Sequence, residues 1–216
     1  MINIWCHRPS TSLGSLANEL RSRGETVRLW TGFERPANCL LWGNGGGNKY
    51  VELARLAEAG VPVPAHSLDP HPGWLARTFR HKEARDLLKM STHGDYYVEY
   101  VPTIREHRIH IIAGRCVRVQ GKLPRTATPH PRFRSWRSGW KLVAGPDTTA
   151  TLPPGARAIA KTAVASLGYQ FGAVDLGTRT DGSPIVFEVN TQPGLEGGTV
   201  RCYADALLLE YSYTEE

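Results

Sequence analysis

The pattern of apolar and polar positions in the first sixty residues predicts a strand, a helix, a second strand and a second helix. Residues 2–7 are rich in β-forming side chains, residues 15–24 have the period of an amphipathic helix, and residues 26–30 return to an extended pattern. Residues 49–60 form a second amphipathic pattern that ends at a glycine, a common C-terminal stop. The pattern predicts a short βαβ-like segment followed by a separate helix.

Longer β patterns dominate the rest of the chain. Residues 95–122 contain a strand, a proline-containing connection and two strands joined at Gly114, which predicts an antiparallel meander. Residues 124–139 have no regular period, but their aromatic residues indicate an ordered loop or lid. The other predicted elements are a strand at 74–79, a helix or helical loop at 81–90, a helix at 153–168, a hairpin at 169–190 and a final helix at 202–213.

Length and charge narrow the class of protein. A chain of 216 residues can bury a core without disulfides or structural metals. The formal net charge is +6, and residues 105–141 hold ten Lys and Arg residues against one acid, Glu106. The positive electrostatic potential of such a basic region attracts anions. It is consistent with a pocket for an anionic small molecule, with a surface for nucleic acid or an acidic protein, or with a merely solvated face.

Cysteine usage and the N-terminus indicate a cytosolic protein. The four cysteines lie far apart, with no CxxC pair and no Cys/His cluster at zinc-ligand spacing, so we expect reduced thiols. The N-terminus lacks the pattern of a secretory signal, and no apolar run reaches the roughly 18 residues of a membrane span. We therefore expect a cytoplasmic protein without a membrane segment.

The last predicted hairpin turns at Asp181 and Gly182. This dipeptide is typical of a two-residue type I′ turn, in which both central residues have positive φ. Such a turn would pair Thr180 with Ser183. Counting back along both strands from that pair then predicts which residues face each other.

This register places Asp175 directly opposite Glu188, with Cβ atoms roughly 4.5–5.5 Å apart. Asn190, two residues beyond Glu188, points to the same face. Two like charges at that distance need a positive partner, and two carboxylates with an amide suit a hard cation such as Mg²⁺. These three residues are therefore the candidate metal site of a nucleotide-using enzyme. The alternative is a set of polar residues on the solvent face of a half-exposed hairpin.

These segments resemble the ATP-grasp superfamily. The runs "FGAVDL" and "VFEVNTQPGLEG", with Asp175 and Glu188 thirteen residues apart, are similar to its metal-binding segment, and other features fit residues 44–205. The resemblance implies an α+β / α/β protein with the ATP-grasp fold, in which two α+β lobes clamp ATP. The implied divisions are a truncated N-terminal βαβ-like segment at 1–43 and an ATP-grasp region at 44–216, split into a first lobe at 44–102 and a metal and substrate lobe at 103–216.

The resemblance also implies a nucleotide-binding set. Lys49 opens the helix whose leading lysine reaches the nucleotide, and Arg77 stands where a second phosphate-binding lysine usually emerges from a strand. The run "YYVEYVP" looks like the hinge that hydrogen-bonds adenine, which gives Glu99, Tyr100 and Val101 that role. The segment after Arg77 lacks the family's glycines, so phosphate cover would come from side chains such as Arg80, His81 and Lys82.

Arg108 and Lys122 are the catalytic candidates. In the family an arginine on the hairpin that holds Arg108 contacts the transferred phosphate or the acyl intermediate. Arg108 and His110 alternate on one predicted strand, and Arg118, Gln120 and Lys122 alternate on the next. A shift of one residue at the turn between them would reverse one set. We expect both sets to share one substrate-facing side, and we expect neither His107 nor His110 to bind a metal.

The resemblance implies an ATP-dependent carboxylate–amine ligase that forms an amide through an acyl phosphate. ATP and Mg²⁺, or Mn²⁺ in its place, would be the cofactors. The substrates would be a small-molecule or peptide carboxylate and an amine, with anionic character suggested by the basic region. A metal-dependent nuclease is one alternative, although Asn190 occupies its usual lysine position. A nucleotide-binding module without turnover is the other. The oligomeric state does not follow from the sequence.

Overall fold

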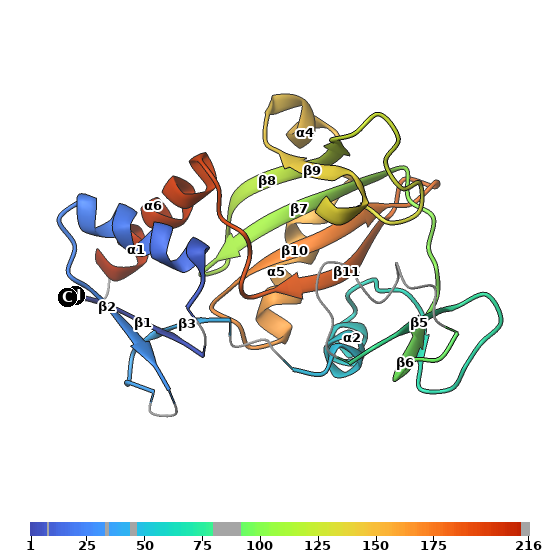
Figure 1. Cartoon of the computed structure of the whole chain (residues 1–216), viewed down its shortest axis with the longest axis horizontal. Coiled ribbons are helices and arrows are strands. Elements are labelled where there is room, and N and C mark those ends of the chain that lie inside the picture. The colour runs from blue at the N-terminus through green and yellow to red at the C-terminus, as the bar shows by residue number, and fades with distance from the viewer. Residues whose placement is uncertain (8, 33–34, 44–46, 80–91, 213–216) are drawn as a thin grey trace.

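The computed structural model describes residues 1–7, 9–32, 35–43, 47–79 and 92–212. The predicted helical loop at 81–90, with Arg80, His81 and Lys82, lies outside them. Within the described residues the strands form a three-stranded sheet near the N-terminus, a five-stranded central sheet and another three-stranded sheet (Figure 1).

The N-terminal sheet is parallel throughout, in the order β2-β1-β3. Its elements are β1 (Ile2–Cys6), α1 (Thr11–Ser22), β2 (Val27–Thr31) and β3 (Leu40–Trp42). The predicted βαβ-like segment is confirmed. The helix begins at Thr11 rather than at residue 15, because the Ser10 hydroxyl accepts a hydrogen bond from the N–H of Leu13 at 3.2 Å and caps it.

The last helix of the chain, α6 (Gly198–Ser212), completes this N-terminal part. It packs beside α1, and Figure 1 places both helices on the same side of the small sheet. Buried side chains from the two ends of the chain share one core, among them Ile4, Leu16, Trp42, Tyr203 and Leu207. No helix in the described part of the chain combines the length and the apolar character that a membrane span needs.

The central sheet is antiparallel, in the order β11-β10-β7-β8-β9. Its strands are β7 (Arg105–Ile112), β8 (Arg115–Pro124), β9 (Trp140–Val143), β10 (Phe171–Thr178) and β11 (Pro184–Asn190). The helix α5 (Ala156–Ser166) packs its buried alanines against the apolar side chains of one face. The pattern did not predict β9 or α4 (Pro146–Ala150), which are both short and follow an irregular segment.

The third sheet has the order β4-β6-β5. It packs against the helix α2 (Lys49–Glu58), whose Leu53 shares a small apolar cluster with Tyr96 and Val98 of β6. Its strands are β4 (His66–Ser67), β5 (Leu75–Arg77) and β6 (Tyr96–Val98). The predicted meander is therefore wrong in its first strand: β6 pairs with β4 and β5, while β7 and β8 pair as predicted. Residues 99–104 carry the chain from one sheet to the other, and Pro102 there lacks the N–H that a ladder requires.

Gly177 of β10 tests how tightly the central sheet is packed. A Cβ at this position would lie 2.5 Å from the Thr103 methyl group and 2.8 Å from the Phe187 ring. We expect Gly177→Ala to lower the free energy of unfolding by about 1–3 kcal/mol, because the added methyl group would overlap with these two side chains and force them to shift. Urea denaturation monitored by circular dichroism would measure the change.

Gly14 gives a matched control in α1. A Cβ there would meet nothing within 4 Å, so Gly14→Ala should raise the free energy of unfolding by roughly 0.5–1 kcal/mol through helix propensity. Equal effects of the two substitutions would contradict the packing that we describe around Gly177.

Candidate active site

A cleft of about 1480 Å³ lies between the open face of the central sheet and the unit formed by α2, β5 and β6. Its apolar lining includes Leu53, Leu75, Val98 and Phe187. All ten residues that the sequence assigns to a site line it, namely Lys49, Arg77, Glu99, Tyr100, Val101, Arg108, Lys122, Asp175, Glu188 and Asn190. The fold thus brings together residues that lie up to 141 positions apart in the chain.

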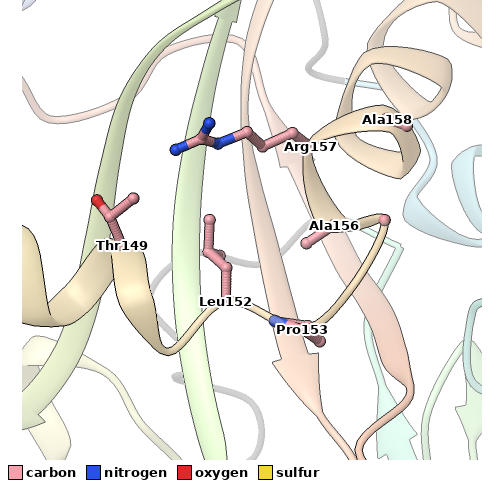
Figure 2. A pocket seen from close by; sticks show the side chains of 7 residues that line it. Thr149, Leu152, Pro153, Ala156, Arg157 and Ala158 are labelled. Carbon is pink, nitrogen blue, oxygen red and sulfur yellow. The ribbon is translucent and has the colours of Figure 1, made fainter.

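A smaller hollow of about 330 Å³ lies where α4 approaches the start of α5 (Figure 2). Leu152, Pro153 and Ala156 supply apolar lining, and Arg157 is the one charged residue of that lining. None of the predicted site residues lines it. The large cleft is therefore the candidate active site.

Four side chains form a row across the cleft face of the central sheet. Glu188 on β11 pairs directly with Asp175 on β10, Asp175 pairs with Arg108 on β7, and Arg108 pairs with Gln120 on β8. The predicted opposition of Asp175 and Glu188 is confirmed. The shared face of the polar sets on β7 and β8 is also confirmed, since His110 pairs with Arg118 in the next row.

The turn that led to this register is not the predicted one. Arg179, rather than Thr180, pairs with Ser183, through an N–H···O bond of 2.8 Å, so the loop has three residues. Gly182 takes a positive φ of 85° at its end. The longer loop shifts the pairing of β10 with β11 by one residue. An irregularity between Asp175 and Leu176 shifts the pairing back, so that Asp175 lies opposite Glu188 as predicted. Two departures from a regular hairpin therefore compensate each other.

Asp175 is buried and bound by two cations. Arg108 Nε donates to its Oδ1 at 2.6 Å and Nη2 donates to its Oδ2 at 2.9 Å, while Lys122 Nζ donates to Oδ2 at 3.2 Å. Burial alone would raise the pKa of Asp175, but the charges and hydrogen bonds of Arg108 and Lys122 outweigh it and hold that pKa well below its usual range. Asp175 is therefore ionised at neutral pH.

Lys122 also binds a second carboxylate, since its Nζ lies 3.0 Å from Glu106 Oε2. Burial acts to lower the pKa of Lys122, and the charges of Asp175 and Glu106 overcome that effect and raise it. The catalytic candidates Arg108 and Lys122 therefore both carry positive charge in the cleft, within reach of one buried carboxylate.

Lys49 connects α2 to the central sheet. Its Nζ lies 2.9 Å from Glu52 Oε2 and 3.1 Å from Glu188 Oε1. Glu52 also accepts a hydrogen bond from the Tyr169 hydroxyl at 3.2 Å. Burial raises the pKa of Glu52, and burial with the nearby Glu52 charge raises the pKa of Tyr169 to about 12. Lys49 is thus held between the predicted metal ligand Glu188 and a buried carboxylate of its own helix.

The predicted adenine hinge follows β6. The N–H of Glu99 donates to the Ala65 carbonyl at 2.8 Å, so a contact from Glu99 to adenine would use its carbonyl or its carboxylate. The guanidinium of Arg132 lies 4.3 Å from the centre of the Tyr100 ring, and the Phe133 ring meets that ring edge to face. The irregular segment before β9 therefore packs against the hinge.

Comparison with known proteins places this geometry in a known fold. Neither a protein-family model nor a curated protein matches the sequence. Solved structures do match: the ATP-grasp ligase PsnB complexed with minimal precursor, Mg and ADP has 14% identity and a TM-score of 0.65, over 97% of this chain and 96% of that one. The macrocyclase MdnC from Microcystis aeruginosa has 11% identity and a TM-score of 0.61, with 98% and 100% covered. A D-alanine–D-alanine ligase from Bacillus anthracis has 12% identity and a TM-score of 0.59, with 100% and 99% covered.

The chain has the ATP-grasp fold. The similarity extends over nearly the whole of each protein, so the short N-terminal sheet belongs to the matched architecture. At these identities the comparison establishes the fold, and the assignment of each site residue depends on the geometry of the cleft.

The N-terminal sheet also contributes to the cleft. Ser10, Ser12 and Gly43 line it at one end. The N–H of Gly43 donates to the Thr191 carbonyl at 2.9 Å, and the N–H of Leu195 donates to Ser12 Oγ at 2.9 Å. The short first segment is therefore fixed to the loop that follows β11.

The sequence did not identify the acidic and phenolic partners of the cleft lysines. Glu52 had a usable signal, because a glutamate three residues after a lysine lies on the same helix face. Glu106 was visible only as the one acid of the basic region, and nothing in the local sequence connects Tyr169 to α2. Their contacts with Lys122 and Lys49 depend on how the elements pack.

The donor set of the cleft fits Mg²⁺. Asp175 and Glu188 supply carboxylate oxygens and Asn190 an amide oxygen, the ligands that Mg²⁺ prefers. Among the described residues no group of three or more His, Cys, Asp or Glu side chains is suited to a metal. A metal here would therefore rely on two carboxylates and one amide, with substrate oxygens and water completing its coordination.

Replacing Asp175 tests the buried charge network. We expect Asp175→Asn to lower the free energy of unfolding at pH 7 by about 3 kcal/mol, because it leaves Arg108 without its buried ion-pair partner and leaves Lys122 with Glu106 alone. Urea denaturation of both proteins at pH 7 and at pH 3 would measure the difference.

The difference should shrink at low pH. A carboxylate with a lowered folded-state pKa stabilises the protein fully above its unfolded pKa of about 3.9, and that stabilisation is lost as the pH falls. A gap between the two proteins that stays constant from pH 7 to pH 3 would contradict the ionised state that we assign to Asp175.

Proposed function

We propose that this chain is an ATP-dependent carboxylate–amine ligase that uses Mg²⁺ and forms an amide through an acyl phosphate. The observation that carries this proposal is the row Glu188, Asp175, Arg108 and Gln120 on the cleft face of an ATP-grasp fold. It puts two carboxylates suited to a metal beside cations suited to phosphate. The remaining predicted residues surround the same cleft.

The nucleotide would lie between the two lobes, which we assign to residues 44–102 and 103–216. Glu99, Tyr100 and Val101 would contact adenine, and apolar side chains of β5, β6 and β11 line the cleft beside them. Lys49 and Arg77 would contact the phosphates from the side of the first lobe. Arginine at position 77 offers a planar fork where a lysine would offer a compact point charge.

The chemistry would proceed in two displacements. An oxygen of the substrate carboxylate attacks the γ-phosphorus, the bond from that phosphorus to the β,γ-bridging oxygen breaks, and ADP leaves. The amine nitrogen then attacks the acyl carbon, inorganic phosphate leaves, and the amine loses a proton to solvent. The fixed charges of Arg108 and Lys122 would offset the negative charge that develops on the transferred oxygens. No side-chain nucleophile is required.

Asp175, Glu188 and Asn190 would hold the metal, which when bound supplies positive charge to the phosphate oxygens. Lys49 forms an ion pair with Glu188, and Arg108 forms one with Asp175. Nucleotide binding would therefore give the cations phosphate oxygens as new partners, and would make the carboxylates accessible to the metal.

The substrate carboxylate and amine belong either to small molecules or to peptides. PsnB and MdnC were solved with precursor peptides, and the matched ligase from Bacillus anthracis is named for D-alanine. Both kinds of substrate are compatible with a cleft of this volume. The basic residues in its wall favour an anionic substrate.

Nucleotide binding is the first test. We expect saturating Mg-ATP to raise the melting temperature of the wild-type protein by several degrees, since a ligand at about 100 times its Kd stabilises the folded state by about 2.7 kcal/mol. Asp175→Asn and Glu188→Gln should each abolish the rise, as should removal of the metal with EDTA. Differential scanning fluorimetry with Mg²⁺ or Mn²⁺ would measure it.

A matched control is Asp181→Asn, which removes an exposed carboxylate from the turn of the same hairpin. This variant should keep the full rise in melting temperature. A wild-type protein that shows no rise at saturating Mg-ATP has no nucleotide site, and the proposal would then be wrong.

Turnover is the second test. ADP release, measured with a coupled assay across paired carboxylates and amines, should depend on both partners. Lys122→Met should lower kcat about 100-fold or more while the Mg-ATP-induced rise in melting temperature persists, since loss of one charge-stabilising donor typically has that effect. Nucleotide binding without ADP release from any pair would favour a binding module, and metal-dependent DNA cleavage without ATP would favour a nuclease.

A further inference from the structure

Arg118 on β8 lines the cleft and has hydrogen-bond donors that the described residues do not use. Lys49, Arg108 and Lys122 each contact at least one carboxylate, whereas Arg118 on β8 has none among the described residues. Its guanidinium donates a single hydrogen bond there, from Nη1 to the weak acceptor Cys202 Sγ at 3.5 Å, and its buried Nε has no acceptor. A guanidinium carries five N–H donors, so Arg118 retains donors for a ligand of the cleft.

Arg118 lies one row away from the proposed reaction centre. It pairs with His110 on β7, whereas the neighbouring Gln120 pairs with Arg108. Side chains two residues apart on a strand are separated by roughly 6.5–7 Å. An anion bound to Arg118 would therefore lie within the length of a small amino acid of the carboxylate and phosphate that react beside Arg108.

The start of α6 makes room for this guanidinium. A Cβ at Gly198 would lie 3.3 Å from both terminal nitrogens of Arg118. Such a contact is tighter than ordinary van der Waals packing, so the missing side chain lets the guanidinium lie against the helix. Arg118, Gly197 and Thr199 all line the cleft at this point.

Gln120 adds a second donor to the same wall. Its Oε1 accepts a hydrogen bond from His110 Nε2 at 2.8 Å, and His110 Nδ1 in turn accepts one from the Tyr203 hydroxyl at 2.9 Å. Burial lowers the pKa of His110 to about 4, so its ring is neutral and carries one N–H. The His110 ring binds the amide oxygen of Gln120, so the amide NH₂ group points away from His110. Because the Gln120 side chain lines the cleft, this NH₂ group can serve as a donor there.

We propose that Arg118 and Gln120 form a subsite for a second carboxylate of the substrate, distinct from the carboxylate that reacts. The substrate class is then a dicarboxylate, such as an acidic amino acid or a related short diacid. This assignment rests on the proposed ligase function for the identity of the reacting group. The subsite itself follows from the donors and their position.

The test uses the full chain saturated with Mg²⁺ and a nonhydrolysable ATP analogue. Melting temperatures are measured against increasing succinate, L-aspartate and L-glutamate, each beside its monoamide, namely succinamate, L-asparagine and L-glutamine. At least one diacid should raise the melting temperature more than its monoamide does. Arg118→Met should weaken binding of that diacid about 10- to 100-fold, the typical effect of losing a charge-assisted hydrogen bond.

Two further variants and one control variant refine the result. Arg118→Lys keeps the charge without the fork and should show an intermediate loss. Gln120→Glu keeps the shape but places a negative charge beside the subsite, so it should also weaken diacid binding. Arg115→Met, an exposed arginine on the same strand, should leave diacid binding unchanged.

Three results would overturn the subsite: no diacid exceeding its monoamide in the wild-type protein, Arg118→Met binding a diacid as tightly as wild type, or Arg115→Met losing as much. Repeating the titration without nucleotide separates the two proposals. A rise with diacid but none with Mg-ATP would reject the ligase function and keep an anion site. A rise with Mg-ATP but none with diacid would reject the subsite alone.

Discussion

The neutralisation of two neighbouring carboxylates on the central sheet governs the rest of this structure. Asp175 and Glu188 face each other across a strand pair, and like charges at that separation are unfavourable without positive partners. Arg108 supplies such a partner from the next strand, Lys122 from the strand beyond, and Lys49 from the helix α2. The arrangement of the elements around the cleft is what brings these three cations to two carboxylates.

This constraint connects stability and function in the same atoms. The contact from Lys49 to Glu188 joins α2 to the central sheet, and the hydrogen bond from Tyr169 to Glu52 joins α2 to the connection between α5 and β10. In the proposed reaction the ammonium group of Lys49 would exchange its contact with Glu188 for a contact with a phosphate of the nucleotide. Elements held by exchangeable ion pairs can adjust when a ligand supplies new partners, whereas the apolar core behind the sheet stays closed under α5.

The N-terminal sheet has a comparable dependence on distant parts of the chain. Three short parallel strands cannot cover their own apolar face, and α1 alone covers part of it. The remainder is covered by α6, from the other end of the chain, and Tyr203 on that helix also reaches His110 in the central sheet. Folding of the small sheet is thereby coupled to the wall of the cleft that holds Arg118 and Gln120.

The sequence by itself determined the local elements and the chemistry of the candidate site. Hydrophobic periods located α1, α2, α5 and the strands of the hairpin, and the spacing of Asp175, Glu188 and Asn190 predicted a candidate set of oxygen donors, because these signals lie within one or two neighbouring elements. Local signals were insufficient where pairing depends on distant segments. The strand β6 belongs to a different sheet from the predicted one, and β9 was not predicted. The predicted turn was wrong, and the predicted pairing of Asp175 with Glu188 is correct only because an irregularity in the hairpin compensates for it. Tertiary structure alone decided that Lys49, Arg108 and Lys122 would reach the two carboxylates while Arg118 would not, because ion pairs across a cleft depend on the packing of whole elements.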